Sequence, residues 1–254
     1  MSAVLLDQRG GVATVTLDRP DRCNALTGDM LDALHAALDR LEDPCAVVLR
    51  AEGRHFSTGG DVAHFAEAVA AGNGRAYAER VVGGLNRAIL RLAALPCPVI
   101  AQVQGALTGG ALGLVLAADL VAMDRRAFIQ PFYVRVGFAP DGGWTAMLPA
   151  RIGAPRARAI QLLNTRLSAE DALELGLAQS ASDDPSAVVA DWLALLADHD
   201  AGAIAATKRL ILDLPALEAA LEAERQAFLE RIETDAVRAG MQRFLLTLKQ
   251  PTEQ

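Results

Sequence analysis

Val99-Ile100-Ala101-Gln102-Val103, followed closely by Gly105-Ala106-Leu107-Thr108-Gly109-Gly110-Ala111, is the stretch that decides the fold of this chain. Apart from Gln102, the first five residues are apolar and largely β-branched, which is typical of a buried strand. The glycines that follow predict a tight loop, and the apolar run from Ala111 to Ala118 predicts a helix that begins at this loop. The order strand, glycine loop, helix indicates an α/β unit.

The same order occurs earlier in the chain. Ala46 to Arg50 reads as a buried strand, the loop Ser57-Thr58-Gly59-Gly60-Asp61 follows it, and Val62 to Ala94 is helical with a break near Gly72. Further strands are expected at Val12 to Leu17 and Leu120 to Ala122. We therefore expect an α/β fold built from ββα units stacked around a twisted sheet.

The last third of the chain changes character. From Ala146 onward the pattern is almost wholly helical, and Ser168 to Asp171 resembles a capping box. Leu214-Pro215 divides the final region, with a last helix expected from about Leu217 to Leu248. We expect residues 1–195 to form the core and residues 196–254 a C-terminal helical region, with no long linker between them.

Bulk composition narrows the class of protein. The chain has 254 residues, 52% of them hydrophobic, and a net charge of −7, so a large core is expected and disorder is not. The negative charge argues against nucleic acid or an anionic membrane surface as the main partner. Cys23, Cys45 and Cys97 lack metal-type spacing, and we expect a reduced, cytoplasmic protein without a metal site.

Targeting and membrane segments are not expected either. The first ten residues lack a basic stretch followed by an apolar one, so no signal peptide is predicted. The longest apolar run, Gly105 to Ala118, is shorter than the roughly 20 residues that a membrane-spanning helix needs.

The two glycine loops also suggest a chemistry. Each can present a bare backbone N–H, and stabilising a developing anion without a metal takes at least two convergent donors. The pair predicts an oxyanion hole and hence a reaction at a carbonyl group. Taken singly, each loop has a structural explanation: Asp61 can cap a helix, and Gly109-Gly110 can serve close helix–sheet packing.

Several motifs in sequence order resemble one family. They are Asn24-Ala25-Leu26, Phe56-Ser57-Thr58-Gly59-Gly60-Asp61, Val103-Gln104-Gly105 through Thr108-Gly109-Gly110, Phe138-Ala139-Pro140-Asp141-Gly142-Gly143, Leu148 to Gly153, and Ala172 to Leu177. Over roughly residues 3 to 250 the chain resembles the crotonase (enoyl-CoA hydratase/isomerase) superfamily. The resemblance implies the crotonase fold, a spiral of ββα repeats followed by a helical region that forms a trimer or a dimer of trimers.

The resemblance also implies a substrate and a binding site. Family members bind acyl-CoA thioesters and polarise the thioester carbonyl with two backbone N–H groups, which here fall at Gly60 and Gly110, without a metal or redox cofactor. Coenzyme A enters as part of the substrate, with its adenine along Ser57-Thr58-Gly59. Arg22 and Lys249 are candidates for its phosphates, unless they are only solvated surface charges. The remaining candidate binding residues are Asp61, Gly109, Phe132 and Trp144.

The acid or base beside the oxyanion hole separates the possible reactions. Hydratases of the family carry two glutamates, at positions that here hold Gly113 and Phe132. Asp141 matches the single acid of some crotonase-like isomerases, including the ring-opening isomerase of phenylacetate degradation. One carboxylate can remove a proton from one carbon and return it to another. Burial near Phe132, Phe138 and Trp144 would raise its pKa.

Three functions follow in order of preference. An enoyl-CoA isomerase with Asp141 as acid and base is favoured. A hydratase or another lyase is the first alternative, and a non-catalytic acyl-CoA-binding protein is the second, because Asp141 could instead be a helix N-cap in a turn.

Overall fold

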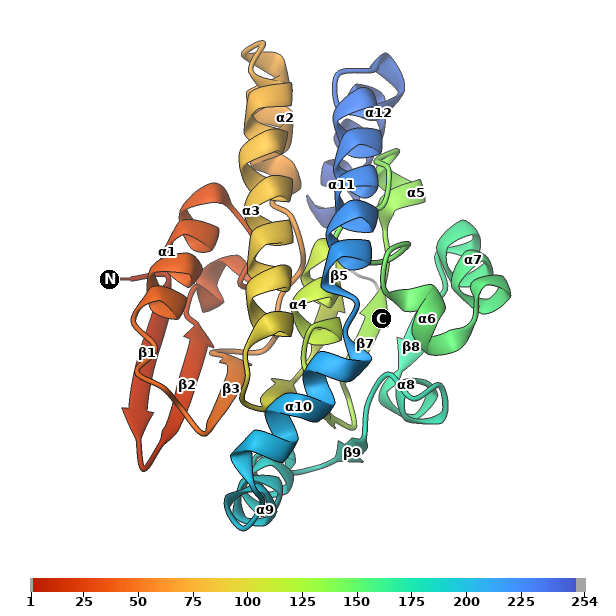
Figure 1. The fold of residues 1–254 in the computed structure, drawn as a ribbon. Helices are drawn as coiled ribbons and strands as arrows, with labels where there is room; N and C mark the ends of the chain where they lie inside the picture. Colours follow the sequence, from red (N-terminus) through yellow and green to blue (C-terminus); the bar gives the residue numbers. More distant parts are fainter. Residues whose placement is uncertain (1, 250–254) are drawn as a thin grey trace.

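The computed structural model describes residues 2–249, and its core is a twisted six-stranded sheet (Figure 1). The strand order is β1-β2-β3-β4-β6-β9; β1 and β2 form an antiparallel hairpin, and all other neighbours are parallel. The strands are β1 (Val4–Arg9), β2 (Val12–Leu17), β3 (Ala46–Ala51), β4 (Val99–Val103), β6 (Leu120–Asp124) and β9 (Ser180–Ser182). The predicted strands are confirmed, whereas β1 and β9 were not predicted.

A smaller layer of extended chain lies beside this sheet. It contains β5 (Ala106–Thr108), β7 (Phe128–Gln130) and β8 (Leu167–Ser168). Two isolated parallel β-bridges extend this layer: one pairs Leu107 with Ser57, and the other pairs Gly60 with Leu26. Each of β2, β3, β4 and β6 is therefore followed by a second extended segment in the smaller layer, which confirms the predicted ββα spiral.

The helices that complete the spiral begin where the sequence predicts. The Thr27 hydroxyl accepts a hydrogen bond from the N–H of Met30 (3.2 Å), and Asp61 caps the next helix in the same way. These elements are α1 (Gly28–Asp39), α2 (Val62–Ala70), α3 (Gly74–Ala94), a 3₁₀ turn (Gly109–Ala111), α4 (Leu112–Leu116) and α5 (Tyr133–Val136). A further 3₁₀ turn, Pro20–Arg22, precedes α1.

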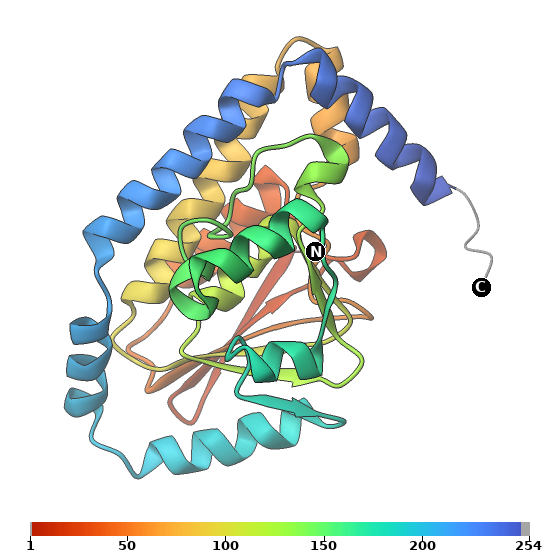
Figure 2. The same ribbon diagram turned by 90° about the vertical axis from the view of Figure 1, so that its right-hand side faces the viewer.

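The C-terminal part is helical, as expected, and wraps around one edge of the core (Figure 2). The capping box of Ser168 and Asp171 is present. The single helix predicted from Leu217 to Leu248 is wrong, because the chain turns at Ile232 to Thr234 and forms two helices. The helices are α6 (Leu148–Ile152), α7 (Ala154–Leu163), α8 (Ala169–Glu174), α9 (Pro185–Ala197), α10 (Ala201–Ile211), α11 (Leu214–Arg231) and α12 (Asp235–Lys249).

Two of these helices pack on the N-terminal core. Helix α11 lies along α3, and α12 packs against α2 and α5 (Figure 1). Leu221, Phe228 and Leu229 of α11 are buried and belong to the main hydrophobic core. Among residues 2–249, no helix combines the length and apolar character needed to cross a bilayer.

Candidate active site

The two glycine loops lie side by side in the smaller layer. The N–H of Ser57 donates to the carbonyl of Ala106, and the N–H of Thr108 donates to the carbonyl of Ser57, each at 3.1 Å. Gly59 has a φ of +76°, and a Cβ there would lie 2.6 Å from the carbonyl oxygen of Thr108. Only glycine fits such a contact at such a φ, so this residue type allows the two loops to touch.

The fold itself does not use the two N–H groups predicted to form the oxyanion hole. At the bridge between Leu26 and Gly60, the bonding groups are the carbonyl of Gly59 and the N–H of Asp61, so the N–H of Gly60 faces away from this bridge. Gly110 lies in the first turn of the 3₁₀ helix, where N–H groups lack an intrahelical acceptor. Within residues 2–249, neither N–H has a protein acceptor.

Asp141 is a buried carboxyl held by a tyrosine. The phenolic hydroxyl of Tyr133 donates to Oδ1 of Asp141 at 2.5 Å and lies 3.0 Å from its backbone carbonyl. Burial raises the pKa of Asp141 from its ordinary 3.8 to about 7; the Tyr133 hydrogen bond lowers this pKa and the nearby charge of Glu224 raises it further. The predicted rise of the pKa is therefore present, and the groups that modify it are the Tyr133 hydroxyl and the charge of Glu224.

The N-cap alternative for Asp141 is wrong. Residues 142–147 form turns, and the next helix, α6, begins only at Leu148. The carboxylate therefore caps no helix, and its position beside Tyr133 needs another explanation.

Glycines bring the Asp141 carboxyl against the second loop. A Cβ on Gly110 would lie 2.9 Å from Oδ1 and 3.2 Å from Oδ2 of Asp141, so the acid is adjacent to a predicted oxyanion donor. A Cβ on Gly113 would overlap the carbonyl oxygen of Gly142 and lie 2.5 Å from Cδ1 of Ile89. The backbone thus leaves no room for a side chain where hydratases of the family carry one of their glutamates.

Glu224 of α11 organises the turn that follows Asp141, and sequence reasoning did not select it. Its buried carboxylate accepts hydrogen bonds from the N–H groups of Gly143 (2.8 Å), Thr145 (2.6 Å) and Ala146 (2.9 Å), and from the Thr145 hydroxyl (2.7 Å). Burial raises the pKa of Glu224. The available signal was an acid three residues after Leu221 and four before Phe228, a spacing that places it on the same helix face as these two apolar residues.

The two aromatic residues predicted to bind substrate have different surroundings. Phe132 has a left-handed φ of +64°, and its ring packs against Phe244 of α12 with 5.8 Å between centroids. Trp144 is fully buried, its indole N–H donates to the carbonyl of Gly109 at 2.7 Å, and its ring meets that of Tyr133 edge-on. The sequence pointed to Tyr133 only through its position, since it directly follows Phe132, which stands where hydratases of the family carry their second glutamate.

The residues predicted to bind coenzyme A lie around the first loop. Arg22 is half exposed and pairs with Asp61 at 3.3 Å, and Thr58 is exposed. Ser57 is fully buried and its hydroxyl donates to the carbonyl of Asn24 at 2.7 Å. Lys249 ends α12, but its side chain lies outside the part of the chain that the structure describes.

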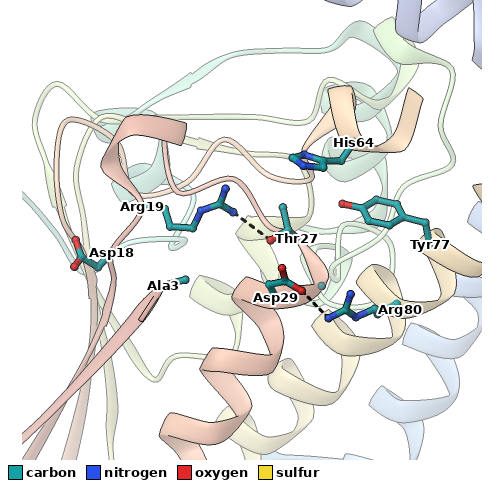
Figure 3. Close-up of a pocket in the computed structure, with 9 residues that line it drawn as sticks. Ala3, Asp18, Arg19, Thr27, Asp29, His64, Tyr77 and Arg80 are labelled. Atoms are coloured by element: carbon teal, nitrogen blue, oxygen red, sulfur yellow. Dashed lines mark hydrogen bonds and ion pairs between the residues drawn. The ribbon is translucent and has the colours of Figure 1, made fainter. Parts of the chain in front are cut away.

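A polar pocket of about 360 Å³ lies at the start of α1, where residues of α2 and α3 also line it, and Asp141 is not among its lining residues (Figure 3). In it, the Arg19 guanidinium donates to the Thr27 hydroxyl at 3.2 Å, and Arg80 pairs with Asp29 at 2.7 Å. Tyr77 lines this pocket, and its ring packs edge-on against Phe65, whose Cε2 would be 3.0 Å from a Cβ on Gly60. Tyr77 and Phe65 therefore link the pocket to Gly60 through successive contacts. The other lining residues are Ala3, Asp18, Gly28 and His64.

The ββα spiral, its paired glycine loops and the C-terminal helices define a protein of the crotonase fold. The chain belongs to the Enoyl-CoA hydratase/isomerase family, whose sequence pattern matches residues 7–254. Membership in this family confirms the resemblance on which the site was predicted.

Some relatives of this chain are named as hydratases and others as isomerases. The chain is 36% identical to a protein named "Probable enoyl-CoA hydratase" of Rhodobacter capsulatus, over 92% of this chain and 91% of the relative. It is 35% identical to the trans-2-decenoyl-[acyl-carrier-protein] isomerase of Streptococcus mutans, over 68% of this chain and 67% of the relative. A crystal structure of an enoyl-CoA hydratase from Mycobacterium avium subsp. paratuberculosis superposes with a TM-score of 0.85 at 29% identity, covering 96% of each chain.

Proposed function

We propose that this protein is an enoyl-CoA isomerase that moves a double bond along the acyl chain, with Asp141 as its acid and base. The observation that carries the proposal is the buried carboxylate of Asp141, whose pKa is raised to about 7 and which lies next to Gly110. A group with a pKa near neutrality can both take and return a proton at working pH.

The number of available carboxylates favours isomerisation over hydration. Hydration needs one group to activate water and another to handle the proton at the α-carbon. Gly113 and Phe132 replace the two hydratase glutamates, and the Glu224 carboxylate accepts its hydrogen bonds from the turn at residues 143–146. Asp141 is the buried acid that lies against Gly110, and we assign the proton transfer to it.

The reaction has two proton transfers and no change in mass. The thioester carbonyl accepts hydrogen bonds from the N–H groups of Gly60 and Gly110. Asp141 removes a proton from the acyl chain, and the electron pair of the broken C–H bond moves through the double bond onto the carbonyl oxygen, giving a dienolate. The protonated Asp141 then returns the proton to a different carbon, which restores the carbonyl and leaves the double bond shifted.

The contact with Tyr133 supports Oδ2 as the oxygen of the Asp141 carboxylate that exchanges the proton with the substrate. Tyr133 donates to Oδ1 of Asp141, and no other residue among 2–249 donates a hydrogen bond to Oδ2. In this proposal Oδ2 both takes and returns the proton, while Tyr133 stays neutral because burial raises its own pKa well above 10.

Substrate placement and assembly belong to the same proposal. Coenzyme A would lie along Ser57, Thr58 and Gly59, with its phosphates near Arg22 and Lys249, as a cytoplasmic thioester substrate.

Assembly into a trimer or a dimer of trimers is supported by exposed apolar side chains in the region beyond residue 195. Leu210 is 83% exposed and Ile211 is 82% exposed in the isolated chain. Molar mass from light scattering tests this assembly.

The reaction is tested with a panel of 2-enoyl- and 3-enoyl-CoA thioesters incubated in H₂¹⁸O. An isomerase gives products of unchanged mass with a shifted double bond, whereas a hydratase adds one molecule of labelled water. Saturable binding of acyl-CoA with neither change would identify a binding protein. Either of the last two results would overturn the proposal.

A further inference from the structure

Trp144 makes an unusual contact with the second glycine loop. Its side chain is fully buried, and its indole Nε1–H donates to the carbonyl oxygen of Gly109 at 2.7 Å. That carbonyl belongs to the same planar peptide unit as the N–H of Gly110. In a trans peptide the C=O and N–H point in opposite directions, so a bond that fixes the carbonyl of Gly109 also fixes where the N–H of Gly110 points.

Two donors hold this peptide unit, because the N–H of Leu112 in the 3₁₀ turn also donates to the carbonyl of Gly109, beside the indole. The unit joins two glycines, and Gly109 has a φ of +54°, in a region where glycine moves with little steric cost, so the second donor adds to its restraint. Stabilisation of a developing oxyanion depends on donors that are already oriented before the reaction starts. A hydrogen bond to the carbonyl also polarises the peptide and strengthens its N–H as a donor.

Trp144 is itself firmly held. The N–H groups of its two neighbours, Gly143 and Thr145, both donate to the Glu224 carboxylate. Its ring packs edge-on against Tyr133, with 6.3 Å between centroids, and Tyr133 holds Asp141. One buried indole thus connects the peptide of Gly110 to the residue that orients the acid.

We propose that Trp144 is a positioning residue that orients and polarises the Gly109–Gly110 peptide, so that the N–H of Gly110 serves as an oxyanion donor. The inference rests on the proposed function, in which Gly110 binds the thioester carbonyl. Trp144 touches no substrate in this role and acts through the backbone alone.

The test replaces Trp144 with phenylalanine, which keeps an aromatic ring but removes the N–H. Trp192→Phe is the matched control, because Trp192 packs in a separate cluster with Val48 and Ile100. The probe is [1-¹³C]decanoyl-CoA, a saturated thioester that cannot isomerise, and the readout is its carbonyl stretch in isotope-edited infrared spectra. Turnover is measured with the enoyl-CoA that reacts fastest in the panel.

Wild-type protein and Trp192→Phe should lower the carbonyl frequency on binding. In Trp144→Phe at least half of this shift should be lost. We expect kcat to fall about 10- to 100-fold, somewhat less than loss of a direct oxyanion donor causes, with KM nearly unchanged. Because phenylalanine leaves a gap, 3-benzothienylalanine incorporated at position 144 provides a second variant with the shape of tryptophan and no N–H.

The outcomes separate the two proposals. No carbonyl shift in the wild-type protein would overturn the oxyanion hole and the role of Trp144 together. A full shift and full kcat in both Trp144 variants would overturn the role of Trp144 alone and leave the isomerase proposal standing.

Discussion

The hydroxyl of Tyr133 donates to Oδ1 of Asp141 at 2.5 Å inside the protein, and this contact makes the two oxygens of the carboxylate unequal. A hydrogen bond to the ionised form of an acid lowers its pKa, so Tyr133 partly offsets the effect of burial. The acid keeps a pKa of about 7 because these opposing effects act on the same group.

Tyr133→Phe should move the pH dependence of isomerisation to higher pH. The reaction needs ionised Asp141, so kcat/KM of the wild-type protein should rise with pH through about 7. Without the tyrosine hydroxyl the midpoint should rise by about one to two pH units, since a hydrogen bond to a charged group is worth about 1.5–3 kcal/mol. Tyr77→Phe is the control, because Tyr77 makes no hydrogen bond to Asp141. An unshifted midpoint in Tyr133→Phe would contradict this role.

Asp141→Asn should abolish isomerisation while leaving thioester binding intact. The amide oxygen can still accept from Tyr133, but the side chain can no longer take a proton, so kcat should fall about 10²- to 10⁴-fold. Initial rates and acyl-CoA titrations by calorimetry check the two statements. Asp198→Asn, at an exposed position after α9, is the control. Full activity of Asp141→Asn on the panel would refute the assignment.

Asp141→Asn should also change how the free energy of unfolding depends on pH. The pKa of the Asp141 carboxyl is 3.8 in the unfolded chain and about 7 in the folded protein. Folding therefore favours the neutral carboxyl. This contribution to stability is complete below pH 3.8 and is lost as the pH rises through 7. Relative to Asp141→Asn, the wild-type free energy of unfolding should fall between pH 4 and pH 8 by at most about 4 kcal/mol. Urea unfolding across this range tests it, and parallel curves for the two proteins would disprove it.

Gly113→Ala should destabilise the protein rather than begin to restore a hydratase site. A Cβ at this position would overlap the carbonyl of Gly142, and overpacking of this kind costs about 1–3 kcal/mol. Gly83→Ala on α3 is the matched control, because the nearest atom to its Cβ would be 3.6 Å away and alanine favours a helix. Thermal unfolding should rank the control above the wild-type protein and Gly113→Ala below it.

The sequence predicted the repeating part of the fold well. The strands from Val12, Ala46 and Val99 were expected because their apolar runs are bounded by glycine and proline, and Thr27 marks the start of α1. Strands β8 and β9 were not expected, since they have two and three residues and their register depends on neighbouring strands. The break at Ile232 to Thr234 lacks a proline or glycine, so helical periodicity alone extended the helix through it.

The site was predictable where it depends on backbone and less so where it depends on tertiary contacts. Glycine motifs indicated Gly60 and Gly110, and a short motif indicated Asp141. Tyr133 and Glu224 reach the site through α5 and α11, and no local pattern states which side chain meets a residue 81 positions away, as Glu224 meets Gly143. Their roles follow from packing.

The Glu224 carboxylate has a consequence for the order in which the protein is made. A ribosome releases the turn bearing Asp141 long before it has synthesised α11, so four hydrogen bonds of that turn form only after synthesis has passed residue 224. A nascent or truncated chain that stops short of residue 224 carries the aspartate and both glycine loops but leaves the turn without its acceptor. Synthesis of α11 is therefore itself a condition for an ordered acid beside the second loop.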